Sequence, residues 1–296
     1  MAPVSEQKPI LLIAGNKRSG STQIMRLLNL HPHVFVSNET DILWILFRLH
    51  NDQEIVPYEE DSPAGMERAL DACGHVLSRN KTPYENFIDF QREAMGQGLG
   101  HLDPMQKENL LFIGDQKPYQ NINPTLLSFA KKHFDDIRLI HPVRHPFTQV
   151  HSAMTHGEDV AGVFLWRGMS VKEVLAQWTK YERKVLEEKE KQELPILDVR
   201  LEDLKSSTEV EMRRILSFLN LTHSSELLRR ARANTGTFYR VHHPLDCPAE
   251  TKRIMRKYSY STNIPFYLKK EVTVRMMSRA RRYFQAAKRK CLGLIQ

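Results

Sequence analysis

Short apolar runs alternate with stretches of helical periodicity along most of the chain. The first run, Ile10 to Ala14, is continuously apolar and ends at Gly15, which is typical of a strand buried on both faces of a parallel sheet. A helix is predicted next, over residues 21–30, and it ends at His31 because a residue before proline avoids the α region. Further strands are predicted over 34–36, 110–113, 137–140 and 196–199, and further helices over 124–132, 147–155 and 210–219.

Strands separated by helices favour an α/β fold of three layers, in which helices cover both faces of a central parallel sheet. We expect a flexible leader over residues 1–9 and a single domain over residues 10–296. Two regions lack periodicity, Asn51 to Gly65 and Thr235 to Pro265, and each is predicted to be a surface loop or lid. A basic amphipathic helix is predicted over residues 271–290.

Composition and charge narrow the function classes. Apolar residues make up 41% and charged residues 26%, as in ordinary folded proteins. The net charge of +8 and the pI near 9.3 indicate an anionic partner. Three distant cysteines make neither a zinc set nor a disulfide framework, and no apolar run is long enough to cross a membrane. We expect a cytoplasmic protein, or one of the Golgi lumen if a leader has been removed.

The segment from Gly15 to Thr22 joins the first strand to the first helix and has the glycines and terminal threonine of a phosphate-binding P-loop. Ser21 stands where a P-loop has lysine, and Lys17 and Arg18 carry positive charge earlier in the loop. Backbone N–H groups and the helix dipole can still hold a phosphate, but the lysine that clamps a nucleoside triphosphate is absent. The fold is therefore expected to be P-loop-like.

A nucleoside triphosphatase also needs a magnesium ligand, commonly an aspartate at the end of a neighbouring strand. The strand over 137–140 leads to Arg144 instead, whereas Asp115, after another strand, keeps a kinase open as an alternative. A phosphosulfate carries less charge at its reacting end than a triphosphate, so basic side chains suffice without a metal. We expect no metal site, because the thirteen histidines show no ligand spacing such as H-E-x-x-H.

The run Lys17 to Thr22 resembles the 5′-phosphosulfate loop of sulfotransferases that use 3′-phosphoadenosine 5′-phosphosulfate (PAPS). With His31-Pro32 and Glu39-Thr40 it is similar to the tyrosylprotein and carbohydrate branch of that family, whose Arg-Ser-Gly-Thr-Thr differs only at Ser21. The resemblance implies that five loop residues bind the 5′-phosphosulfate: Arg18, Ser19, Gly20, Ser21 and Thr22.

The resemblance also assigns the 3′-phosphate to Arg144 and Ser152, which lie eight residues apart across a helix start. A guanidinium supplies paired donors to phosphate oxygens and a hydroxyl adds a third. Glu39 follows the second strand and matches the family's base, which would take the proton of the acceptor hydroxyl. A cap on the helix starting near Thr40 is the alternative for Glu39.

The segment Gly114 to Pro118 resembles the family's Gly-Asp-Lys-x-Pro element, with Gln116 as a departure. Lys117 is accordingly predicted to stabilise the bridging oxygen of the donor, together with Lys17, and a surface lysine is the alternative. A histidine base in place of Glu39 is a further alternative. Leu201 stands where the family often has tyrosine before Glu202 to Leu204, and this segment is interpreted as structural, at a turn leading into a helix.

These observations predict a sulfotransferase that moves a sulfuryl group from PAPS to a hydroxyl acceptor, a small molecule or a carbohydrate, and releases adenosine 3′,5′-bisphosphate (PAP). The alternatives are a P-loop kinase and a catalytically degenerate nucleotide-binding protein. The resemblance also implies that residues 234–260 close over the nucleotide. We expect no nucleic-acid partner, and the sequence does not indicate the oligomeric state.

Overall fold

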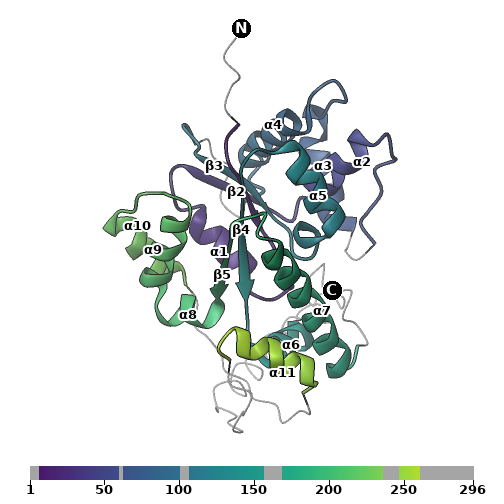
Figure 1. Ribbon diagram of the computed structural model, residues 1–296. Helices are drawn as coiled ribbons and strands as arrows, with labels where there is room; N and C mark the ends of the chain where they lie inside the picture. The colour runs from purple at the N-terminus through teal and green to yellow at the C-terminus, as the bar shows by residue number, and fades with distance from the viewer. Residues whose placement is uncertain (1–6, 60–62, 101–106, 157–168, 236–246, 261–296) are drawn as a thin grey trace, which may run out of the picture.

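Five parallel strands form one sheet in the computed structural model, which describes residues 7–59, 63–100, 107–156, 169–235 and 247–260 (Figure 1). The order across the sheet is β2-β3-β1-β4-β5. The strands are β1 (Ile10–Ile13), β2 (Val34–Asn38), β3 (Phe112–Gln116), β4 (Ile137–Val143) and β5 (Ile196–Arg200). Helices cover both faces of the sheet, which confirms the predicted three-layer α/β fold.

Strand β1 occupies the centre of the sheet, between β3 and β4. Ile10 and Leu12 pack into the core on one face, and Leu11 and Ile13 pack into the core on the other. All four side chains are fully buried. Because successive side chains of a strand point to opposite faces, a strand covered on both sides has to be apolar at every position.

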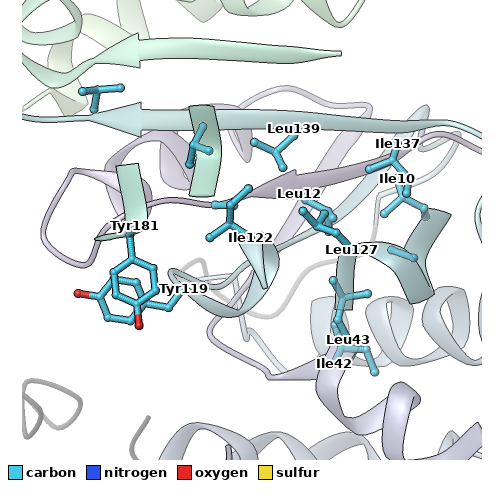
Figure 2. Packing of buried hydrophobic residues seen from close by; sticks show 14 of the residues in the cluster. Ile10, Leu12, Ile42, Leu43, Tyr119, Ile122, Leu127, Ile137, Leu139 and Tyr181 are labelled. Carbon is cyan, nitrogen blue, oxygen red and sulfur yellow. The ribbon is translucent and has the colours of Figure 1, made fainter. Parts of the chain in front are cut away.

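The larger core contains Tyr119 and Tyr181, and Figure 2 shows the two rings stacked beside Ile122. It lies between the sheet and the helices α2 (Ile42–His50), α3 (Pro63–Cys73), α4 (Pro83–Gly96), α5 (Pro124–His133), α6 (Pro146–His156), α7 (Val171–Lys191) and α11 (Ala249–Lys257). The smaller core lies under α1 (Ser21–Leu28), α8 (Leu201–Ser206), α9 (Thr208–Phe218) and α10 (Ser225–Asn234). Two short 3₁₀ turns, Gly74–Val76 and Gln120–Ile122, complete the described elements.

Two predicted loops contain helices. Helix α11 occupies residues 249–257 of the region predicted as a loop over Thr235 to Pro265, so that prediction is wrong there. Thr251, Ile254 and Met255 are buried at helical spacing, although the segment is polar and basic overall. Helix α3 begins at Pro63, inside the loop predicted to reach Gly65.

Strand β3 runs two to three residues later than predicted. It includes Gly114, Asp115 and Gln116, whereas Leu111 is 52% exposed and precedes the strand. A Cβ on Gly114 would lie 2.0 Å from the Leu11 carbonyl oxygen, so the close approach of β1 requires glycine there.

Lys8 lies against the folded part of the chain. Lys8, in the predicted leader, donates from its backbone N–H to the Tyr84 hydroxyl at 2.6 Å and from Nζ to the Leu110 carbonyl at 2.9 Å. The last residues of the leader therefore lie against the domain. The helix predicted over residues 271–290 lies outside the described residues.

Candidate functional site

The carboxyl ends of four adjacent strands bring the predicted site residues to one edge of the sheet. The phosphate loop follows β1, Glu39 follows β2, Lys117 follows β3 and Arg144 follows β4. Ligands bind at this edge in open parallel sheets because the loops that leave the strands meet there. The fold thus gathers residues that are more than 100 positions apart in the sequence.

The phosphate loop ends in an uncapped helix. Gly20 is the N-cap residue of α1, with φ 102°, and α1 has no side-chain cap and no acidic residue in its first turn. The first N–H groups of this helix are therefore available to an anion. A Cβ on Gly20 would lie 2.6 Å from Leu201 Cδ1, so glycine serves both the left-handed backbone and the packing.

The remaining loop residues are held by local hydrogen bonds. The Ser19 hydroxyl donates to the Asn16 carbonyl at 2.7 Å and is fully buried. Ser21, at the lysine position, accepts a hydrogen bond from Gln116 Nε2 at 2.9 Å. Gln116 is the residue by which the Gly-Asp-Lys element departs from the family pattern, so the two departures contact each other. Thr22 is the second residue of α1 and is half-buried.

Arg18, Arg144 and Ser152 meet beside the loop. Arg18 Nε donates to Ser152 Oγ at 3.3 Å, and Arg144 Nη1 donates to the Arg18 carbonyl at 3.0 Å. Arg144 Nε also donates to the Thr148 hydroxyl at 3.1 Å. We call Arg18, Arg144 and Ser152 the arginine cluster, and it joins the phosphate loop to the end of β4 and to α6.

Burial and like charge make the arginine cluster electrostatically unfavourable without an anion. Burial lowers the pKa of Arg144 to about 10, with Arg18 contributing in the same direction and Glu202 opposing. Burial also lowers the pKa of Arg18, against the attraction of Glu39. The pKa of Lys205, on α8, is lowered by burial and by Arg144. An anion bound here would relieve this repulsion between cations.

Glu39 lies close enough to Arg18 to influence it electrostatically, and it is half-buried. Its backbone is left-handed, with φ 51°, and its N–H donates to the Gln116 carbonyl at 2.8 Å. Helix α2 begins at Ile42 with Asp41 as its N-cap residue. Glu39 therefore precedes the cap position, which does not favour the alternative interpretation of Glu39 as a helix cap.

Lys117 is buried in an ion pair. Its Nζ lies 2.8 Å from Asp41 Oδ2, and the two side chains are 1% and 2% exposed. Gln120 also donates to Asp41.

Lys17 is nearly buried, and its Nζ lies 5.4 Å from the centroid of the Tyr119 ring. Tyr119 in turn stacks on Tyr181, with 3.7 Å between the ring centroids. These cation–π and stacking contacts orient Lys17 along the loop.

Asp115 is fully buried and accepts several hydrogen bonds. Its Oδ1 accepts from the Ser37 hydroxyl at 2.9 Å and from the Thr40 hydroxyl at 2.8 Å, while Asn121 Nδ2 lies 3.4 Å from Oδ2. Burial raises its pKa, and these donors oppose the shift. Its carboxylate therefore holds β2, β3 and the 3₁₀ turn after β3 together, and a magnesium ion would compete with those donors.

Helix α8 and the segment that follows α11 contribute residues that the sequence pattern does not single out as functional. Glu202 accepts from the His145 N–H at 3.0 Å and from the Tyr260 hydroxyl at 2.7 Å. The Arg200 guanidinium lies 4.5 Å from the centroid of the Tyr260 ring. The segment predicted as a turn before a helix is the first turn of α8 itself. Its acidic pattern marked a helix start but gave no sign of the contact with Tyr260.

No group of three or more histidine, cysteine, aspartate or glutamate side chains in the described part of the chain is placed to hold a metal ion. None of the helices in that same part has the length and apolar character to span a membrane.

Comparison with known proteins identifies the family. The sulfotransferase family model matches residues 9–225, well over half of the chain, and the chain belongs to this family. The sulfotransferase domain of the Synechococcus PCC 7002 olefin synthase is 19% identical, with a TM-score of 0.57, over 89% of this chain and 99% of that domain. The sulfotransferase domain from the curacin biosynthetic pathway is 20% identical, with a TM-score of 0.57, over 88% of this chain and all of that domain. A sequence search of curated proteins gives no match.

The family assignment and the fold agree. The sequence-based identification as a sulfotransferase is confirmed by the family match, and the two structures share the α/β fold at low identity. Membership of the tyrosylprotein and carbohydrate branch and the roles of individual residues stay predictions.

Proposed function

We propose that this sulfotransferase transfers the sulfuryl group of PAPS to a hydroxyl acceptor by in-line displacement. The observation that carries the proposal is the arginine cluster beside the uncapped N-terminus of α1, with Glu39 in electrostatic reach of Arg18. A region with two half-buried cations and helix N–H groups that have no side-chain cap suits a ligand with two anionic ends.

The proposed binding roles follow the geometry of the edge. The 5′-phosphosulfate is assigned to the loop and the start of α1, over residues 18–22, because the first N–H groups of α1 have no side-chain cap. The 3′-phosphate is assigned to Arg144 and Ser152, which converge from β4 and α6. Two hydrogen-bond donors on one guanidinium fit phosphate oxygens better than a single ammonium does.

The proposed chemistry uses Glu39 as the base. Its carboxylate takes the proton of the acceptor hydroxyl while the acceptor oxygen bonds to sulfur, and the bond from sulfur to the phosphate oxygen of PAP breaks. We assign the stabilisation of the negative charge that develops on the departing phosphate oxygen to Lys117 together with Lys17, as the sequence predicts. No metal takes part in this scheme.

The acceptor class and the subfamily belong to the proposal as well. The run Arg18 to Thr22 together with Glu39 supports a place near the tyrosylprotein and carbohydrate branch, because a glutamate base accompanies this loop there. We propose a small molecule or a carbohydrate as the acceptor, and cytoplasmic location stays a prediction.

Titration calorimetry tests the donor assignment. PAP in the presence of EDTA should bind to the wild-type protein, while ATP should give no heat with EDTA or with magnesium. The matched variant Arg144→Ala should lose most of the PAP heat and keep its thermal unfolding transition. Magnesium-dependent binding of ATP without binding of PAP would instead assign the protein to the nucleoside triphosphate enzymes.

A further inference from the structure

A chain of buried polar side chains lies directly beneath the first two residues of the phosphate loop. Asn16 is 1% exposed, and its Nδ2 donates to Glu182 Oε1 at 2.7 Å and to the Trp178 carbonyl at 3.2 Å. Both acceptors belong to α7, which is the long helix that crosses this face of the sheet. Nothing in the proposed chemistry uses Glu182.

The chain continues from Glu182 to β4 and β5. His141 Nε2 lies 3.4 Å from Glu182 Oε2, and His141 Nδ1 lies 2.8 Å from Asp198 Oδ1. His141 and Glu182 are both fully buried, and Lys189 pairs with Asp198. Although burial alone would lower the pKa of His141, Glu182 and Asp198 raise it to about 9. The carboxylates of Glu182 and Asp198 thus face the basic side chains of His141 and Lys189 beneath the loop.

The same residues touch the loop at two consecutive positions. Asn16 is hydrogen-bonded to Glu182, and a Cβ on Gly15 would lie 2.9 Å from His141 Cδ2. The loop then turns through Arg18 and Gly20, which both have left-handed backbones with φ 66° and 102°. At Arg18, which is not a glycine, this conformation is strained and stays in place only when the surroundings hold it.

Helix α7 also contacts the second anion-binding element. Trp178 Nε1 donates to the Arg144 carbonyl at 3.3 Å, one helical turn before Glu182. Residues 178 and 182 lie on the same side of the helix, so α7 fixes the loop and Arg144 relative to each other. A buried ion pair seldom stabilises a fold more than apolar packing would. A role in fixing the conformation of the loop is therefore the better explanation of the Glu182–His141 pair.

We infer that Glu182 is a positioning residue, which sets the phosphate loop through Asn16 and the adjacent His141 so that the loop N–H groups face the donor. The identity of that ligand rests on the proposed function. Glu182 acts on the ligand only through the loop, because its hydrogen bond to Asn16 comes from α7, behind the loop.

Amide hydrogen exchange of the unliganded protein tests the inference without reference to any ligand. Glu182→Ala should speed exchange in the peptide that covers residues 15–20, and Asn16→Ala should do the same while leaving the carboxylates, His141 and Lys189 in place. Glu182→Gln should restore protection, because a glutamine oxygen can still accept from Asn16. Glu188→Ala is the matched control. Glu188 is buried six residues further along α7, and its carboxylate pairs with Lys131 and Lys191.

PAP affinity and steady-state kinetics supply the second measurement. Losing this buried hydrogen bond should weaken PAP about tenfold or more in Glu182→Ala and in Asn16→Ala. The KM for PAPS should rise while kcat changes little, and the double variant should be no weaker than the weaker single variant because both remove one interaction. Glu188→Ala should bind PAP as the wild type does.

Several results would overturn the inference. Unchanged loop exchange in Asn16→Ala, or an equal loss of PAP affinity in Glu182→Ala and Glu188→Ala, means that Glu182 acts on stability alone. If Glu182→Ala does not fold, Asn16→Ala decides the question. A wild-type protein that binds no PAP contradicts the proposed function, and loop exchange then decides the inference separately.

Discussion

Two groups of charged side chains lie at the same edge of the sheet, and they differ in how their charges are compensated. In the arginine cluster, Arg18 and Arg144 lie close together, and the charge of Arg18 adds to the burial that lowers the pKa of Arg144. In the second group, Lys117 and Asp41 form an ion pair that is fully buried, with Gln120 as a further donor to Asp41. The first group has excess positive charge and the second is balanced.

Because of this difference, we expect the arginine cluster to serve ligand binding and the Lys117–Asp41 pair to serve folding. Excess positive charge that is partly desolvated creates a strong attraction for an anion. A balanced buried pair has no such attraction, but it cannot lose one member without leaving a charge in the protein interior. Variants of the arginine cluster and of Glu39 should therefore change ligand binding or turnover, whereas variants of the Lys117–Asp41 pair should first change stability.

The largest effect is expected for Glu39→Gln. Glutamine has nearly the same shape but cannot take the acceptor proton, so kcat for transfer of labelled sulfate from PAPS should fall by about 100- to 10,000-fold. The measurement uses a phenolic or sugar acceptor found by screening, and calorimetry with PAP serves as the control because the nucleotide site is unchanged. If kcat of Glu39→Gln equals that of the wild type, Glu39 is not the base and another residue takes the acceptor proton.

Lys117→Met should mainly destabilise the fold. The substitution leaves the Asp41 carboxylate buried without its cation, which should lower the free energy of unfolding by about 3–5 kcal/mol, measured by urea denaturation. Adding Asp41→Asn should recover part of this loss because the uncompensated charge is then gone.

The same pair of variants decides the predicted role of Lys117 at the bridging oxygen. A Lys117→Met protein that unfolds at the wild-type urea concentration but has lost turnover would contradict the comparison and assign Lys117 to the chemistry. A doubly substituted protein that is stable and inactive would show that the ion pair and the chemistry both use this lysine.

The sequence predicted the sheet well because its strands carry their signal locally. Ile10 to Ile13 is apolar at every position since both faces of β1 are covered, and a turn and a helix follow at once. Helix α11 escaped prediction because only Thr251, Ile254 and Met255 face the core within a polar, basic segment. A sparse buried face of this kind gives a weak periodic signal.

The candidate site likewise has one part that the sequence predicts and other contacts that it does not. The phosphate loop is a continuous segment with fixed glycines, so its place between β1 and α1 was predictable. The contact of Asn16 with Glu182 joins residues 166 positions apart, and Glu182 belongs to no motif that would mark it as a partner of the loop. The pairing of Lys117 with Asp41 likewise depends on how β2 and β3 end side by side. Only the folded arrangement determines such contacts.

The smallest effect is expected for Ser152→Ala, and it tests the arginine cluster most finely. Ser152 Oγ accepts from Arg18 Nε at 3.3 Å in the structure, so the hydroxyl has either a direct role at the 3′-phosphate or an indirect one through Arg18. A direct contact predicts an affinity for PAP that is about three- to tenfold weaker in Ser152→Ala, the usual range for one hydrogen bond. Affinity for adenosine 5′-monophosphate, which lacks the 3′-phosphate, should then be unchanged.

The two nucleotides separate the two roles because they differ only at the 3′ position. Equal weakening for both would mean that Ser152 acts through Arg18 on the 5′ end of the ligand. Thr148→Ala provides a control on the same helix, one turn earlier, since the Thr148 hydroxyl accepts from Arg144 Nε at 3.1 Å and donates to the His145 carbonyl at 2.9 Å. A loss specific to PAP in Ser152→Ala, larger than that in Thr148→Ala, places the 3′-phosphate beside Ser152 of α6 and supports the arginine cluster as the site that binds the anion.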